Sequence, residues 1–129
     1  MTRQHELAVR FRALHVQGTF VIANVWDGAS AALMASLGFK ALATSSAACA
    51  AALGRLDGQI TREQALAHGG LIASLSPLPV AADLENGFGP SPETVARTIE
   101  LAAAAGLVGG SIEDAAAMRA SRSTPSSTR

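Results

Sequence analysis

The sequence predicts an α/β protein in which about four strands lie parallel in one sheet. Short apolar runs alternate along the chain with longer segments of helical periodicity, the pattern of repeated βα units. The apolar runs are continuous, as is typical of parallel strands that are covered on both faces. The chain has 129 residues, of which 49% are hydrophobic, enough for the core of one ordinary domain.

The first half of the chain contains two of these units. Leu7, Phe11 and Leu14 lie on one face of the first predicted helix, at spacings of four and three residues. Asp27 or Ser30 is expected to cap the second helix, which Gly38 ends. The elements expected here are helices at 3–16 and 29–39 and strands at 20–23 and 40–46.

The second half begins with a short Ala-rich helix and a loop, and then has the clearest helix signals. Thr61 and Gln64 have the spacing of a capping box. Ser91 and Pro92 suit the cap and first position of a later helix, and Gly106 suits its end. The elements expected here are helices at 47–53, 62–75 and 91–106, a loop at 54–58, and strands at 80–85 and 108–114.

Carboxylates follow the carboxyl ends of the predicted strands. Asp83 and Glu85 are two residues apart in what is predicted to be an extended segment, so their side chains are expected to point the same way. Gly87 and Gly89 would let the backbone turn beside them. The acidic residues expected at this edge of the sheet are Asp27, Asp57, Asp83, Glu85, Glu113 and Asp114.

Clustered carboxylates repel one another unless a cation compensates them, and ligands that are all oxygen favour a hard ion such as Mg²⁺. A zinc site is not expected, because the histidines lie far apart in the sequence, none is expected near these loops, and Cys49 is alone. Asp27 and Asp114 are better explained as a helix cap and a turn residue. For Asp83, Glu85 and Glu113 the pattern alone leaves a metal site and solvated turn residues equally open.

Two further segments have alternative interpretations. Cys49 is more readily explained as a small packed residue than as a nucleophile. Thr44–Ser46 is either a turn with satisfied hydroxyls or a group of N–H and hydroxyl donors that binds an anion.

Charge and composition limit the partners. The formal net charge is zero and the basic residues are dispersed, so neither nucleic acid nor a membrane surface is expected as a partner. The N-terminus lacks the apolar core of a signal peptide, and no apolar run is long enough to span a bilayer. A single cysteine cannot form an internal disulfide. These features predict a cytoplasmic protein.

The end of the chain differs from the rest. Residues 115–129 carry three Arg, four Ser, two Thr and one Pro, without any acidic residue, and are predicted to be a disordered or aberrant tail. Residues 1–114 are therefore expected to form the folded part, which is mildly acidic.

Three linked motifs resemble one known family. The segments "NVWDGASAALMASLGFKALATSSAACAAALGRLDGQIT", "PVAADLENGFG" and "GLVGGSIED" are similar, in this order, to the isocitrate lyase / phosphoenolpyruvate mutase superfamily, and closest to its carboxyvinyl-carboxyphosphonate phosphorylmutase-like members. The resemblance runs from about Leu7 to Asp114. It implies part of a (β/α)₈ TIM barrel, about four βα units, with Mg²⁺ at its C-terminal face.

The resemblance also assigns roles to residues. Asp83 would be the nearest metal ligand, and the other metal-site residues would act largely through water. Ser45, Ser46 and Ala47 would hold a substrate carboxylate, and Trp26, beside Asp27, would contact the substrate. The metal set that the resemblance implies is Asp57, Asp83, Glu85 and Glu113. The catalytic residues stay unknown.

The implied activity is that of a Mg²⁺-dependent lyase or phosphonomutase (an isomerase). It would act on small 2-oxo or 2-hydroxy carboxylates, or phosphonates, through an enolate-like intermediate. Family enzymes continue well beyond the position of Asp114, so we expect a truncated or frameshifted product. Half a barrel would leave two open sheet edges and favour self-association. Its inward side chains would include Ile22, Leu42, Ala81 and Ile112.

Two alternatives remain. One is a catalytically inactive remnant that at most binds Mg²⁺ and a small carboxylate. The other is an open flavodoxin-like sheet, which would have helices on both faces and acidic residues that only cap helices.

Overall fold

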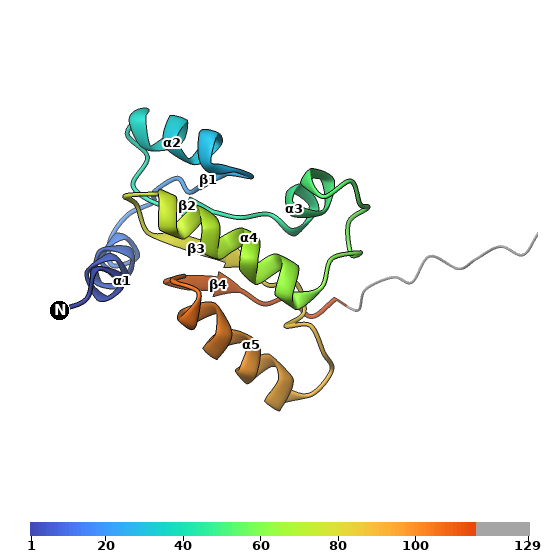
Figure 1. Cartoon of the computed structure of the whole chain (residues 1–129). Coiled ribbons are helices and arrows are strands. Elements are labelled where there is room, and N and C mark those ends of the chain that lie inside the picture. The colour runs from blue at the N-terminus through green and yellow to red at the C-terminus, as the bar shows by residue number, and fades with distance from the viewer. Residues whose placement is uncertain (116–129) are drawn as a thin grey trace, which may run out of the picture.

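Four parallel strands, in sequential order, form the centre of the protein (Figure 1). The computed structural model describes residues 1–115, so most of the predicted tail, 115–129, lies outside the described residues. The strands are β1 (Ala23–Asn24), β2 (Leu42–Ala43), β3 (Val80–Asp83) and β4 (Gly109–Ser111). The helices are α1 (Arg3–Leu14), α2 (Gly28–Ser36), α3 (Ser46–Ala52), α4 (Arg62–Leu75) and α5 (Pro92–Ala104).

The helices begin where the local sequence predicts. Asp27 caps α2 in a reciprocal box with Ser30, and Thr61 caps α4 in the same way with Gln64. Ser91 caps α5, with Pro92 in its first turn. The strands are shorter than predicted, and β1 begins at Ala23 instead of Phe20. Pairing with β2 begins at Ala23, which is level with Leu42.

The main core lies between the sheet and one layer of helices. Val25, Leu42 and Val80 face helices α2, α4 and α5 and are buried with residues such as Ile72 and Ala102. Sequential strand order and a single helix layer are features of a (β/α) barrel and not of a doubly wound sheet. The predicted partial barrel is therefore confirmed, and the flavodoxin-like alternative is wrong.

The other face of the sheet is an open hollow. Ile22 and Ala81 line it as predicted, together with Asn24. Leu42 was expected here but packs in the core. Successive side chains of a strand point to opposite faces, and on β2 it is Ala43 that faces the hollow. Ile112 was also expected here, but it lies beyond the end of β4 in a groove beside Pro92 and Val95 of α5.

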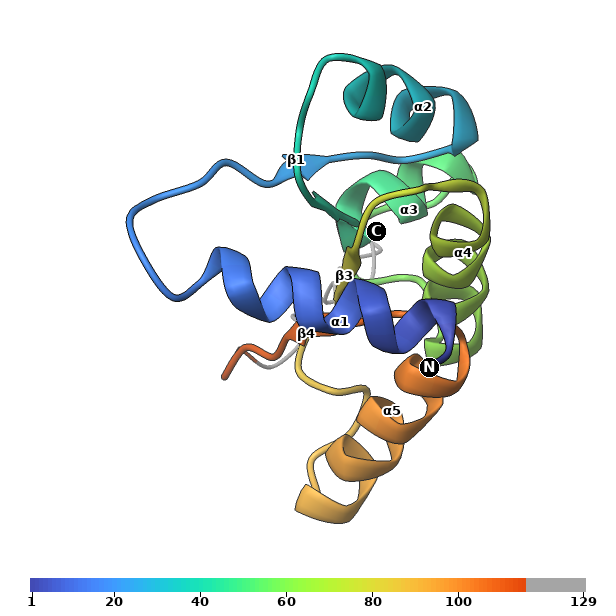
Figure 2. The same cartoon turned by 90° about the vertical axis from the view of Figure 1, so that its left-hand side faces the viewer.

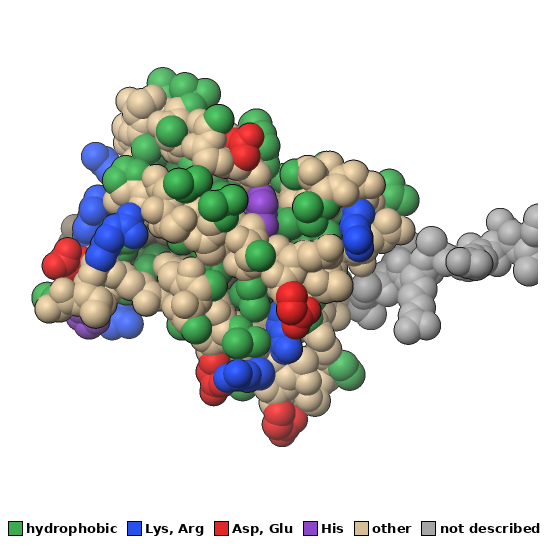
Figure 3. Space-filling view, viewed as in Figure 1, with side chains coloured by type: hydrophobic (Ala, Val, Ile, Leu, Met, Phe, Trp, Pro, Cys, Tyr) green, Lys and Arg blue, Asp and Glu red, His purple; other side chains and the backbone are tan. Residues whose placement is uncertain are grey.

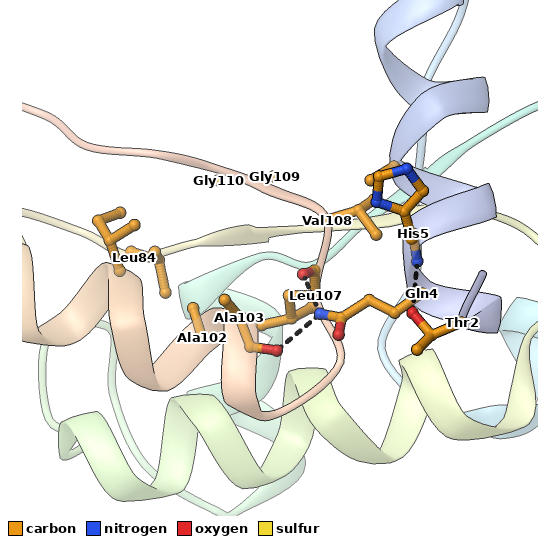
Figure 4. A pocket seen from close by; sticks show the side chains of 12 residues that line it. Thr2, Gln4, His5, Leu84, Ala102, Ala103, Leu107, Val108, Gly109 and Gly110 are labelled. Atoms are coloured by element: carbon orange, nitrogen blue, oxygen red, sulfur yellow. Dashed lines mark hydrogen bonds between the residues drawn. The ribbon is translucent and has the colours of Figure 1, made fainter.

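Helix α1 crosses the amino-terminal end of the strands (Figure 2). The Arg3 guanidinium donates to the Ser76 carbonyl, in the connection that enters β3. Gln4 Nε2 donates at 2.6 Å to the carbonyl of Ala103, in the last turn of α5, and at 3.0 Å to that of Leu107, in the connection that enters β4 (Figure 4). The carboxyl ends of the strands stay open as a result.

None of the helices described within residues 1–115 has the length and apolar character needed to cross a membrane. The cytoplasmic location stays a prediction.

Candidate functional site

An open pocket of about 680 Å³ lies at the carboxyl ends of β2, β3 and β4. All four predicted metal-site residues and three of the four predicted substrate-binding residues line it. Its lining is Ser45, Ser46, Ala47, Asp57, Gly58, Ile60, Asp83, Glu85, Asn86, Phe88, Gly89, Glu113 and Ala115. Binding sites of parallel α/β folds occur at this edge, since the loops that follow the strands converge there.

Asp83 is the last residue of β3 and is held by backbone donors. Its Oδ2 accepts from the Ser46 N–H at 2.9 Å, and its Oδ1 accepts from the Glu85 N–H at 3.0 Å. Its own N–H donates to Thr44 Oγ1 at 3.1 Å. Asp83 thus joins the ends of two neighbouring strands.

Ser45 and Ser46 are partly used within the protein. Ser45 Oγ caps α3 by accepting from the Ala48 N–H at 3.3 Å, and the Ser46 N–H is bound to Asp83. The Ser46 hydroxyl also bonds to Asp83. The groups of this segment that remain for a ligand are the Ser45 hydroxyl proton and the N–H of Ala47, which lies in the first turn of α3 and so has no carbonyl partner within the helix.

Glu85 reaches the pocket by a different route from the one predicted. The strand ends at Asp83, and Glu85 has φ 50°, in the left-handed region, so the two-residue alternation does not extend to it. Its carbonyl accepts from the Glu113 N–H at 2.8 Å. This backbone bond brings the loop after β3 and the end of β4 together, and with them two of the carboxylates.

The carboxylates differ in their tendency to ionise. Burial works against ionisation of Asp83, but hydrogen bonds from Ser46 and Glu85 outweigh it and lower the pKa of Asp83. Burial raises the pKa of Glu85, and repulsion from Asp83, Asp57 and Glu113 raises it further. Asp83 is therefore a stabilised anion, whereas Glu85 is a carboxylate that a nearby cation would stabilise.

The pocket meets one test for a hydrated hard cation. Its ionisable donors within residues 1–115 are carboxylates, with Ser hydroxyls and the Asn86 amide beside them. Over the same residues, no three Asp, Glu, His or Cys side chains are grouped so that they could hold a metal ion as they stand. Oxygen donors are the ligands that Mg²⁺ prefers, whereas zinc sites are usually built from Cys and His.

Trp26 and Asp27 lie apart from this pocket. Asp27 is the N-cap of α2, as expected, and its hydrogen bonds with Ser30 lower its pKa. Trp26 is half exposed in the loop after β1 and does not line the pocket. The Trp26 carbonyl accepts from His68 Nε2 of α4 at 2.7 Å. The expectation that no histidine lies near these loops is therefore wrong.

Cys49 is buried behind the pocket in α3. Burial, with the negative charge of Glu85 nearby, raises the pKa of its thiol. A buried thiol with a raised pKa is a poor nucleophile, so Cys49 fits the interpretation as a small packed residue.

Asn86, Phe88 and Ile60 line the pocket and were not predicted to do so. Asn86 follows the acidic pair directly, so its place in the same loop was a usable signal. Ile60 reaches the pocket through the long connection after α3, and nothing in its local sequence indicates this.

A second hollow, of about 470 Å³, lies between α1 and α5 beside β4 (Figure 4). Leu84, Ala102 and Leu107 make it largely apolar, and none of the predicted site residues lines it. It is therefore not the candidate site.

Comparison with known proteins identifies the family. The sequence profile of the phosphoenolpyruvate phosphomutase family matches residues 11–128. A crystal structure of a lyase/mutase candidate from Burkholderia cenocepacia J2315 is 52% identical, with a TM-score of 0.88 over 91% of this chain. The structure of 2,3-dimethylmalate lyase, a PEP mutase/isocitrate lyase superfamily member, is 34% identical, with a TM-score of 0.74 over 90% of this chain.

A third structure, of oxaloacetate acetylhydrolase in complex with the product oxalate, is 32% identical, with a TM-score of 0.77 over 87% of this chain. The chain spans 43%, 41% and 41% of these three proteins, less than half of each. The profile nevertheless matches most of the sequence. This chain belongs to the phosphoenolpyruvate phosphomutase family, within the PEP mutase/isocitrate lyase superfamily.

Proposed function

We propose that this chain carries the Mg²⁺- and carboxylate-binding part of a lyase or phosphonomutase site. The observation that supports it most is the convergence of Asp57, Asp83, Glu85 and Glu113 on one pocket. The substrate class would be small 2-oxo or 2-hydroxy carboxylates, or phosphonates. Relatives named for 2,3-dimethylmalate and oxaloacetate support this class.

Each part of the pocket has a task in this proposal. Asp83 would be the principal metal ligand, because backbone N–H groups already hold it as an anion. Asp57, Glu85 and Glu113 would bind the waters of the ion. Mg²⁺ would supply neutralisation of charge that develops on the substrate oxygens. Ser45, Ser46 and Ala47 would orient the substrate carboxylate, whereas Trp26, which does not line the pocket, is given no part in this proposal.

The charge of the pocket predicts an order of binding. Four carboxylates repel an anionic substrate, so a cation has to be present before a carboxylate ligand binds. Oxalate, a small dicarboxylate, is therefore expected to raise the melting temperature only when Mg²⁺ is present.

The test compares four conditions by thermal denaturation: no ligand, oxalate, Mg²⁺, and both. Asp83→Asn removes the principal ligand and is expected to abolish the shift, and Asp114→Asn is a matched control outside the pocket. An equal shift with oxalate alone, or an undiminished shift in Asp83→Asn, would refute the proposal.

A second candidate is binding without turnover by the 129-residue chain. Among the described residues, the pocket lining contains no His, Lys, Cys or Tyr side chain that could serve as a general acid or base. Assays for C–C cleavage of 2-hydroxy dicarboxylates, run on a chain whose Mg²⁺ binding has been verified, separate the two candidates. Turnover that Asp83→Asn abolishes favours the enzyme, and binding without turnover favours the second candidate.

A further inference from the structure

The loop between β3 and α5 has a strained backbone. Glu85 and Phe88 have φ values of 50° and 64°, and Gly87 between them has φ 85°. Residues with a side chain rarely adopt this region, and they persist there only where the surroundings hold them. Because Glu85, Asn86 and Phe88 line the acidic pocket, whatever holds this loop also sets the shape of the pocket.

Thr98 of α5 holds the middle of the loop. It is completely buried, and its Oγ1 donates to the Gly87 carbonyl at 2.8 Å. The Thr94 carbonyl, one turn earlier in the same helix, is a second acceptor at 3.0 Å. The hydroxyl has one proton, so the bond to Gly87 competes with a bond inside the helix.

Close packing supports this attachment. A Cβ placed on Gly87 would lie 2.6 Å from Val95 Cγ2, and one on Gly89 would lie 2.5 Å from Thr94 Cγ2. The loop therefore lies directly against the first turns of α5. Van der Waals packing alone does not fix which way the Gly87 peptide points. The hydrogen bond from Thr98 to the Gly87 carbonyl does fix it.

We propose that Thr98 is a positioning residue for the Mg²⁺ site, which it does not touch. Through the Gly87 carbonyl it fixes the turn that places Glu85 and Asn86 in the pocket. The proposal rests on the proposed Mg²⁺ function. The competing explanation is that Thr98 only satisfies its own helix through Thr94, which would affect stability and leave the loop and the metal unchanged.

The test uses two variants of the whole chain. Thr98→Val keeps the shape and removes the donor, leaving the buried Gly87 carbonyl without a partner. Thr98→Ser keeps the donor and removes a methyl group, so it controls for lost packing. Amide hydrogen exchange is measured by NMR at the Gly87 and Phe88 N–H groups, which bond to the Leu84 carbonyl and to Asn86 Oδ1. The reference is the Val25 N–H, which bonds to the Ala43 carbonyl of β2.

We expect Thr98→Val to accelerate exchange at Gly87 and Phe88 about tenfold relative to Val25, and to weaken Mg²⁺ binding about tenfold, the usual range for residues that orient metal ligands. Thr98→Ser should stay within about twofold of the natural chain on both measures, well below that range. If Thr98→Val does not fold, Thr98→Cys replaces it, since a thiol is a weaker donor and should still loosen the loop more than Ser.

Equal loop exchange in the Val (or Cys) and Ser variants would overturn the proposal, as would a loosened loop with unchanged Mg²⁺ affinity. Failure of the proposed function looks different. If the natural chain binds no Mg²⁺, there is no site to position and the proposal fails with it, while the exchange rates still show whether Thr98 holds the loop.

Discussion

Asp83 and Glu85 are separated by one residue but have opposite electrostatic environments. Two backbone N–H groups hold Asp83 as an anion, whereas burial and three neighbouring carboxylates disfavour the charge on Glu85. The chain thus keeps one fixed negative charge beside another that costs stability. A bound cation would attract the Glu85 carboxylate and offset this repulsion. Substitutions of Asp83 and Glu85 are therefore sensitive tests of the site.

Glu85→Gln is expected to stabilise the protein without Mg²⁺. The raised pKa of Glu85 means that the folded state loses stability as pH rises through that pKa, so the penalty is larger at neutral pH than in acid. Because Glu85 is partly exposed, we expect a gain below about 1 kcal/mol. Thermal melts at pH 4 and pH 7 check this. With saturating Mg²⁺, the natural chain should instead be the more stable of the two. A Glu85→Gln variant that is less stable than the natural chain at pH 7 without metal would contradict the prediction.

Asp83→Asn is expected to destabilise the protein at neutral pH. The lowered pKa of Asp83 contributes stability above its unfolded pKa, and this stability is lost as pH falls through the folded value. Asn retains one acceptor, so about one hydrogen bond, worth about 1 kcal/mol, is lost. Urea denaturation from pH 7 to pH 2 measures the difference, which should shrink in acid. A difference that is constant with pH would show that the charge has no role.

At the scale of elements, α4 holds the loop after β1. His68 Nε2 bonds the Trp26 carbonyl, which can only accept, so this nitrogen carries a proton. On the other side of the loop, the N–H groups of Trp26 and Asp27 donate to Ser30 Oγ. The loop is thus held from both sides by α4 and α2.

His68→Ala is expected to loosen this loop. Trp26 is the single tryptophan of the chain, so intrinsic fluorescence reports on the loop directly. We expect stronger acrylamide quenching and a red-shifted emission in the Ala variant, with partial recovery in His68→Gln, whose amide can donate. Identical quenching in the natural chain and both variants would show that the His68 bond does not order Trp26.

Most elements could be predicted from local signals, because caps and stops are written in adjacent residues, such as Thr61 with Gln64 or Ser91 with Pro92. The errors concern longer range. His68 and Trp26 are 42 residues apart, and no spacing rule relates them. Phe20, predicted to begin a strand, instead stacks edge-on with His15 before pairing starts.

The candidate site shows the same division. The edge at which the carboxylates gather followed from the βα order, and the structure places Asp57, Asp83, Glu85 and Glu113 there. The backbone conformation that brings Glu85 there could not be predicted, because glycine is the usual sequence signal for a positive φ and this position is a glutamate. In the sequence, Thr98 is one of two threonines in a helix of mixed polarity, which does not reveal its partner.

At the scale of the whole molecule, two sheet edges and several apolar side chains are exposed. β1 and β4 each pair with one neighbour within the described chain. Apolar side chains also gather on the outer surface of α2 and α4, including Leu33, Leu37, Leu71 and Leu75 (Figure 3). Unpaired edges favour association with another chain, so self-association of the 129-residue chain remains our prediction.

Analytical ultracentrifugation across a concentration series checks this prediction. Val21 is exposed near the β1 edge, and Lys at such a position opposes pairing between edges. Val21→Lys is therefore expected to shift the 129-residue chain toward monomer. Val16→Lys makes the same change at an equally exposed position beyond the end of α1 and should not. A natural chain that is monomeric throughout the series would contradict the prediction.

The central claim is that carboxylates from separate loops share one divalent cation at the carboxyl ends of the strands. Titration of the ¹⁵N-labelled chain with paramagnetic Mn²⁺ tests it most directly, because broadening of amide signals locates the ion. We predict broadening first at Ser46, Asp57, Glu85 and Glu113, reversed by excess Mg²⁺ and lost in Asp83→Asn. Broadening centred elsewhere, or none at millimolar Mn²⁺, would contradict the claim.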